Sequence, residues 1–126
     1  MEWQDEQTWV LPRETASAGL ARRHVEATCP DLSPEQLDTA RLLVTELVSN
    51  ALRHGEGSVV LVVSRADDVV RIGVEDDGPS MPAVTHHPVL AQQGRGLQLV
   101  AGLAGTWGVV RRVDGQPGKQ VWFDLG

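Results

Sequence analysis

Hydrophobic side chains recur at intervals of three and four residues over one long stretch in the middle of the chain. The apolar positions of this stretch are Leu37, Ala40, Leu43, Val44, Leu47, Val48, Ala51 and Leu52. A capping box precedes this stretch, formed by Ser33 and Gln36. Pro34 occupies the first helical position. Gly55 and Gly57 follow the stretch. The pattern therefore predicts a long amphipathic helix that begins after Ser33 and stops at Gly55.

Shorter hydrophobic runs flank this helix. Residues 8–11 predict a short strand that Pro12 ends, and residues 16–29 predict a surface helix. Residues 59–64 and 69–74 are rich in valine and isoleucine, and the Ala-Asp-Asp segment between them suits a hairpin turn. Two antiparallel strands are therefore expected directly after the long helix.

The second half of the chain repeats this alternation of helix and hairpin. Residues 76–93 contain three prolines and no periodicity, which predicts a loop. A second amphipathic helix is expected to open at Gly94. Residues 107–113 and 120–125 predict a final hairpin, joined by the glycine-containing segment 114–118.

This order of elements predicts an α/β fold. Helices on one face of a mixed, mainly antiparallel sheet would form a two-layer α/β sandwich. The chain has 126 residues, of which 41% are hydrophobic and 22% charged, so a single globular domain over residues 1–126 is expected.

Charge and composition exclude several classes of function. The formal net charge of −6 repels phosphate backbones, so nucleic acid is not expected as a ligand. Cys29 is the only cysteine, which is typical of a small buried residue and predicts neither a disulfide nor a zinc site. The N-terminus lacks a signal sequence and no apolar run could span a membrane, which predicts a cytoplasmic protein.

Two polar residues lie at the rim of the apolar arc of the long helix. Glu46 and Asn50 are four residues apart and share one helix face. Asn50 could offer its side-chain oxygen to Mg²⁺, and Glu46 could orient or deprotonate a nucleophile. An ordinary helix boundary is the alternative interpretation of this pair.

Two glycine-containing loops carry further candidate chemistry. Asp76 ends a hydrophobic strand, where its carboxylate could accept a hydrogen bond from the exocyclic amine of a base, and Gly78 would allow a close backbone approach. Gly94 and Gly96 lead into a helix, whose N-terminus could bind phosphate. A plain Asp-Gly turn and a flexible helix entry are the respective alternatives.

The three motifs in this order are more specific for one protein family than any one of them alone. Residues 46–54 (ELVSNALRH) resemble the N box of the GHKL ATPase superfamily, residues 76–80 (DDGPS) its first glycine box, and residues 94–97 (GRGL) its second. The chain is most similar to actinobacterial proteins related to anti-sigma-factor serine kinases. The resemblance implies the histidine-kinase-like (Bergerat) ATPase fold with ATP and Mg²⁺ as ligands.

The resemblance also implies a role for individual residues. Asp76 would bind the adenine amine, Asn50 would bind Mg²⁺, and Glu46 would be the catalytic base toward a serine or threonine hydroxyl. The remaining nucleotide-binding positions would be Arg53, Gly78, Ser80, Gly94, Arg95, Gly96, Leu97 and Gln120. A carboxylate at position 76 would favour adenine over guanine, because guanine presents a carbonyl where adenine presents its amine.

Some positions depart from the family pattern or leave alternatives open. Ser80 replaces a glycine of the first glycine box, and Gln120 replaces a threonine that often helps to fix adenine. These departures suggest reduced affinity for ATP. Arg53 and His54 either contact the γ-phosphate or cap the helix.

Two classes of function follow from the resemblance. The first is a protein serine/threonine kinase and anti-sigma factor, with a sigma factor and an anti-anti-sigma protein as partners. The second is a non-catalytic module in which ATP sets the shape of a partner-binding face. A detached catalytic half of a histidine kinase ranks last, because the first thirty residues contain no long helical hairpin and no phosphoacceptor context. Residues 9–23 are the candidate homodimer face.

Overall fold

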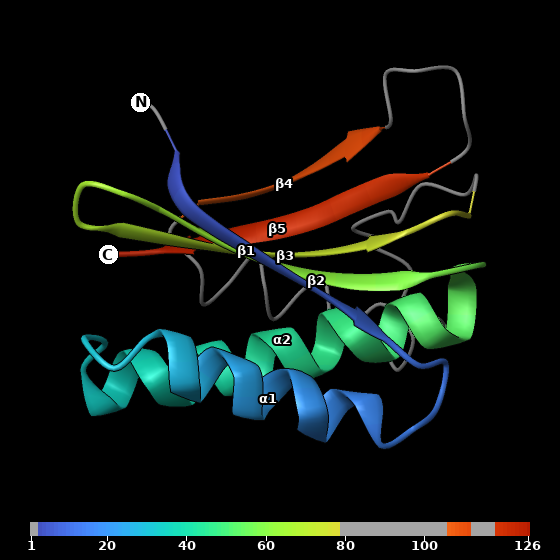
Figure 1. Ribbon diagram of the computed structural model, residues 1–126, viewed down its shortest axis with the longest axis horizontal. Coiled ribbons are helices and arrows are strands. Elements are labelled where there is room, and N and C mark those ends of the chain that lie inside the picture. Colours follow the sequence, from blue (N-terminus) through green and yellow to red (C-terminus); the bar gives the residue numbers. More distant parts are fainter. Residues whose placement is uncertain (1–2, 79–105, 112–117) are drawn as a thin grey trace, which may run out of the picture.

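The computed structural model describes residues 3–78, 106–111 and 118–126. Figure 1 shows two helices lying against one twisted sheet. The elements are β1 (Gln4–Leu11), α1 (Ser17–Thr28), α2 (Pro34–His54), β2 (Val59–Ala66), β3 (Val69–Asp76), β4 (Thr106–Arg111) and β5 (Lys119–Leu125). No helix within these ranges is long and apolar enough to cross a membrane.

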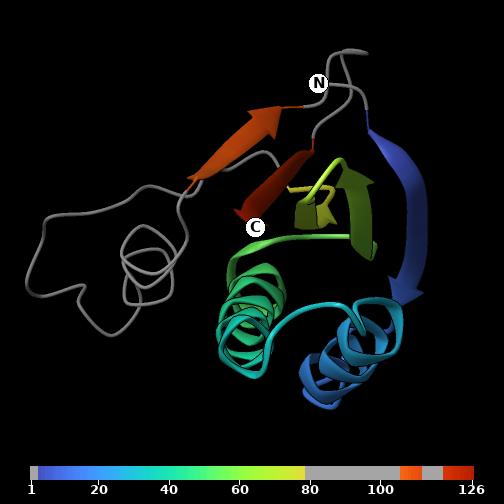
Figure 2. The same cartoon turned by 90° about the vertical axis from the view of Figure 1, so that its left-hand side faces the viewer.

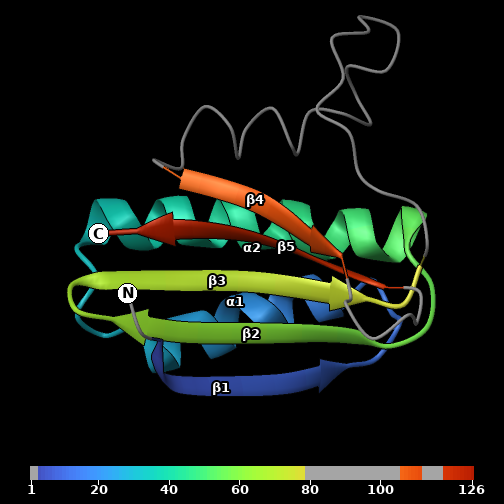
Figure 3. The same ribbon diagram turned by 90° about the horizontal axis from the view of Figure 1, so that it is seen from above.

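The sheet has five strands in the order β1-β2-β3-β5-β4. Each neighbouring pair is antiparallel. β5, the last strand in sequence, therefore lies between β3 and β4, as Figure 3 shows from above. The expected α/β sandwich is confirmed, with every described strand pair antiparallel. The helix predicted from Gly94 lies outside the described residues.

The long helix begins and ends as its sequence predicts. The Ser33 hydroxyl accepts a hydrogen bond from the Gln36 backbone N–H at 3.1 Å. In return, the Ser33 backbone N–H donates to the Gln36 side-chain oxygen at 3.0 Å, which completes a capping box. α2 then runs to His54, and Gly55 follows as its C-cap. Gly55, directly after the helix, thereby lies against the Asp76 side chain at the end of β3.

The core lies between the sheet and the two helices, which cover the same face (Figure 2). α2 contributes Leu43 and Val44, and the sheet contributes Leu61, Ile72 and Phe123, all fully buried. Cys29 is also fully buried, and its burial raises the pKa of the thiol. The expectation that Cys29 is a small buried residue is therefore confirmed.

β1 is longer than its hydrophobic pattern indicates. The strand starts at Gln4 rather than at residue 8, and its first five residues are exposed. The pairing with β2 shifts register between Gln4 and Gln7, and Asp5 has a φ of 52°. This segment is a bulged, polar edge strand that pairs through backbone hydrogen bonds, so no alternation of apolar residues marks it.

Candidate functional site

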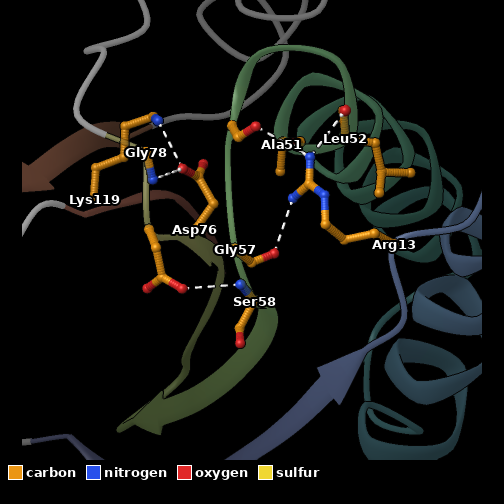
Figure 4. Close-up of polar contacts among 10 residues, drawn as sticks. Arg13, Ala51, Leu52, Gly57, Ser58, Asp76, Gly78 and Lys119 are labelled. Carbon is orange, nitrogen blue, oxygen red and sulfur yellow. Dashed lines mark hydrogen bonds and ion pairs between the residues drawn. The ribbon is translucent and has the colours of Figure 1, made fainter.

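Asp76, the predicted base-binding residue, lies where the turn after α2 packs beside the ends of β3 and β5. Asp76 is the last residue of β3 and pairs with Lys119, the first residue of β5. The turn at residues 55–58 connects α2 to β2 and packs against the same corner (Figure 4). Three segments that are distant in sequence thereby converge on one carboxylate.

Asp76 is a buried carboxylate with one oxygen in use. Its side chain faces the core side of the sheet and is 4% exposed. Oδ1 accepts hydrogen bonds from the Gly78 backbone N–H at 2.7 Å and from Lys119 Nζ at 2.9 Å. Oδ2 accepts none from the part of the chain that the structure describes. Within the described residues Asp76 thus keeps one acceptor oxygen available, and the Gly78 backbone N–H holds the other oxygen.

The partner of Asp76 is a residue that the sequence analysis did not select. Lys119 is 8% exposed and forms a buried ion pair with Asp76. It is also the only lysine of the chain. Its inward orientation follows from strand alternation, because Val121, Phe123 and Leu125 on the same face of β5 are buried. That alternation, together with the rarity of lysine here, is the sequence signal that could have identified it.

Gln120 lies on the other face of the sheet. It pairs with Glu75, and its side-chain amide donates to the Glu75 carboxylate at 3.1 Å. Gln120 also packs over Gly73, where an added Cβ would lie 2.9 Å from the Gln120 amide carbon. The structure therefore does not bring Gln120 to Asp76. Successive strand residues point to opposite faces, so Lys119 takes the place expected for Gln120.

The turn after α2 fits tightly against the two carboxylates of the first glycine box. A Cβ on Gly55 would lie 2.5 Å from the Asp76 carboxyl carbon, and Gly57 has a φ of +68° that favours glycine. The Asp77 carboxylate accepts from the Ser58 backbone N–H at 2.9 Å. These contacts set the position of the Asp76 side chain relative to the end of α2.

Arg13, between β1 and α1, holds this turn in place from the other side. Its guanidinium donates to the carbonyl oxygens of Ala51 and Gly55 at 3.1 Å each. It also donates to those of Leu52 at 3.0 Å and Gly57 at 3.1 Å. Most carbonyls at a helix C-terminus lack intrahelical partners, and Arg13 donates to that of Leu52 (Figure 4). The Ala51 carbonyl also accepts from the Gly55 backbone N–H.

Replacement of Arg13 by methionine is expected to lower the free energy of unfolding by about 1–2 kcal/mol. The variant loses charged hydrogen bonds but keeps an aliphatic stem, and solvent limits the effect because the side chain is exposed. Denaturant unfolding followed by circular dichroism measures the change. Arg23→Met, at another exposed arginine, is the control and should change stability by less than about 0.5 kcal/mol. Equal effects of both substitutions would contradict the assigned role.

The N-box residues project from the last turns of α2. Glu46 is half-buried and forms no hydrogen bond or ion pair with the described residues. The Asn50 side-chain oxygen accepts a hydrogen bond from Arg53 at 2.9 Å. No cluster of three His, Cys, Asp or Glu side chains occurs among the described residues, so Asn50 would bind a metal only together with ligands from elsewhere. Among the described residues nothing occupies the Glu46 carboxylate, which a base must keep available for a proton.

Five of the predicted site residues lie outside the described part of the chain. They are Ser80, Gly94, Arg95, Gly96 and Leu97. The described part of the chain therefore includes Asp76, which is predicted to bind the base, and the predicted N-box residues.

Comparisons with known proteins identify the family to which the chain is similar. Residues 11–125 match the model of the histidine kinase-like ATPase domain family. A stretch of 51 residues is 41% identical to the signal transduction histidine-protein kinase AfsQ2 of Streptomyces coelicolor. That stretch is 40% of this chain and 9% of the kinase, so the chain spans only a small part of its relative.

Proposed function

Since this chain belongs to the family of histidine kinase-like ATPase domains, we propose that it is an ATP-binding regulatory protein whose Asp76 recognises the adenine base. One observation carries the proposal: Asp76 is a buried carboxylate that keeps Oδ2 open. Leaving an acceptor unpaired inside a protein is costly, and the amine of adenine is a suitable donor for it.

Mg²⁺ and the phosphates would bind at the other end of the site. Asn50 offers an amide oxygen, a ligand type that suits Mg²⁺, which when bound neutralises phosphate charge. Arg53 now donates to that oxygen, so it would have to release Asn50 when the metal arrives. Arg53 could then contact phosphate oxygens. Ser80, Gly94, Arg95, Gly96 and Leu97 would supply the remaining contacts to the nucleotide.

We propose that the chain is a protein kinase specific for serine or threonine. Glu46 would accept the proton of the hydroxyl as its oxygen attacks the γ-phosphorus, and ADP would leave. The free carboxylate of Glu46 supports this role. An anti-anti-sigma protein would be the phosphorylated partner and a sigma factor the restrained one, in a cytoplasmic protein.

A homodimer through residues 9–23 is part of the same proposal. Val10 is 73% exposed on the edge strand, which leaves an apolar side chain for a partner. Trp9 on the opposite side of the strand is stacked on His24, with ring centroids 4.6 Å apart, and belongs to the monomer. Val10 is therefore the side chain on β1 that would contact a second copy.

One observation favours a second candidate, a module that binds ATP without transferring phosphate. Arg53 occupies the oxygen of Asn50 that would otherwise bind Mg²⁺. If this hydrogen bond persists in the complex, nucleotide could bind through Asp76 while the phosphates lack their metal. ATP occupancy would then change only the shape of a partner-binding surface.

Calorimetric titration with MgATP tests the proposed site. Wild type is expected to show saturable binding with one site, and Asp76→Asn to weaken it at least tenfold, because the amide is a poorer acceptor and can place its NH₂ toward the ligand amine. Asp68→Asn, an exposed aspartate in the β2–β3 turn, should bind like wild type. Absence of binding to a folded wild type would overturn the proposal.

A further inference from the structure

Lys119 holds one oxygen of Asp76 and leaves the other for a ligand. Asp76 Oδ1 accepts hydrogen bonds from Lys119 Nζ at 2.9 Å and from the Gly78 backbone N–H at 2.7 Å. Both donors bind the same oxygen, so Oδ2 stays available within the described residues. These two hydrogen bonds thereby fix the orientation of the carboxylate (Figure 4).

The ammonium group of Lys119 is itself only partly used. An ammonium has three protons, and the bond to Asp76 is the one hydrogen bond that Lys119 makes within the described residues. Lys119 is 8% exposed, and removing an ammonium from water is costly unless acceptors replace the lost hydration. A ligand acceptor beside Asp76 would therefore complete the contacts of Lys119.

Adenine presents such an acceptor directly beside its amine. On the Watson–Crick edge of the base, the N6 amine is a donor and the neighbouring ring nitrogen N1 is an acceptor. In the protein, Asp76 Oδ2 offers an acceptor and Lys119 Nζ offers a donor, and their 2.9 Å ion pair keeps the two side chains together. Donor and acceptor are therefore complementary to adenine. Guanine presents them in the opposite order, with O6 as acceptor and N1–H as donor.

We propose that Lys119 is a second base-binding residue, whose ammonium donates to N1 of adenine while Asp76 accepts from the N6 amine. This inference rests on the proposed nucleotide site at Asp76. It gives the ammonium a contact with the ligand in addition to its ion pair, whereas a purely structural lysine would only neutralise Asp76. Removal of N1 from the ligand separates the two roles, because it leaves the ion pair of the protein unchanged.

Calorimetric titration of wild type with two analogues of ATP is the first test and needs no variant. 1-Deaza-ATP carries a C–H in place of N1 and keeps the amine, whereas purine riboside triphosphate lacks the amine and keeps N1. With Mg²⁺, each is expected to bind about tenfold to a hundredfold more weakly than ATP, since each loses one hydrogen bond to a charged group.

The two analogues separate the inference from the proposed function. Binding of 1-deaza-ATP within about threefold of ATP would overturn the role of Lys119, while weak binding of purine riboside triphosphate would leave the role of Asp76 intact. Binding of purine riboside triphosphate as tight as that of ATP would instead refute the proposed contact of Asp76, on which the inference depends. Absence of ATP binding would refute both.

Lys119→Met gives the second test. The variant is expected to lose the preference for ATP over 1-deaza-ATP, with the two dissociation constants within about threefold of each other, because no donor remains for N1. Arg41→Met removes a cation at an exposed ion pair with Glu26 and should keep the preference of wild type. Circular dichroism establishes that both variants fold. An unchanged preference in folded Lys119→Met would refute the role of Lys119, since another group would then bind N1.

Discussion

Asp76→Asn is expected to lower the free energy of unfolding by about 3–5 kcal/mol, the cost of removing one partner from a buried ion pair. Lys119 is 8% exposed and has Asp76 as its carboxylate partner at 2.9 Å, so the substitution leaves an ammonium without a counter-charge inside the protein. Urea denaturation followed by circular dichroism measures the change. Asp68→Asn, in an exposed turn, should stay within about 0.5 kcal/mol of wild type.

The double variant Asp76→Asn/Lys119→Met isolates the ion pair from the other contacts of Asp76. Replacing both charges removes the uncompensated ammonium, so the double variant should be more stable than Asp76→Asn alone. The variant also keeps a side chain of similar length on β5. Additive effects of the two substitutions would mean that Asp76 and Lys119 do not stabilise one another, contrary to the 2.9 Å contact.

Glu46→Gln is expected to reduce phosphate transfer by roughly 10²–10⁴-fold, the range typical for loss of a general base. The substitution keeps the size of the side chain and removes its ability to take a proton. Because Glu46 makes no hydrogen bond within the described residues, binding of MgATP and stability should change little. Transfer of radiolabel from ATP to a candidate protein partner, with calorimetry in parallel, measures both quantities.

Glu35→Gln is the matched control for this experiment. Glu35 lies in the first turn of the same helix and is exposed, so its replacement should leave transfer unchanged. The chemical stability of the product tests the acceptor residue, since phosphoserine and phosphothreonine survive acid that hydrolyses phosphohistidine. Transfer at the wild-type rate by Glu46→Gln would refute Glu46 as the base. Absence of transfer by wild type to any cognate partner would favour the non-catalytic module.

A buried ion pair at the end of two central strands is unusual for stability alone. Well-packed apolar residues at the positions of Asp76 and Lys119 would be expected to stabilise the fold equally well or better. Strands β3 and β5 are otherwise apolar on this face, with Val74 and Val121 as the next inward residues. The polar pair interrupts that pattern where a ligand would bind, which is typical of functional sites.

The sequence by itself determined most of the local structure. The capping box at Ser33 and the apolar arc of α2 predict a helix that the structure confirms, because these signals act within a few residues. The valine-rich runs likewise mark β2 and β3. The start of β1 could not be predicted, since its exposed polar residues pair with β2 through the backbone alone.

Individual motifs also predicted candidate site residues. The sequence marks Asp76 by its position two residues before Gly78. It marks Glu46 and Asn50 by their spacing of four residues along one helix. Their contacts were not predictable in the same way. Arg53 on Asn50 is local and could have been anticipated from the spacing of three, whereas Arg13 reaches carbonyls about forty residues away.

Only the tertiary structure decided which residue of β5 stands beside Asp76. Lys119 and Gln120 are adjacent in sequence, and a shift of one residue in the pairing of β5 with β3 would exchange their faces. The register depends on burying Val121, Phe123 and Leu125 against the helices, a packing constraint that involves the whole sheet. A motif fixes the chemistry that is available, but the sheet register selects the side chain that reaches the site.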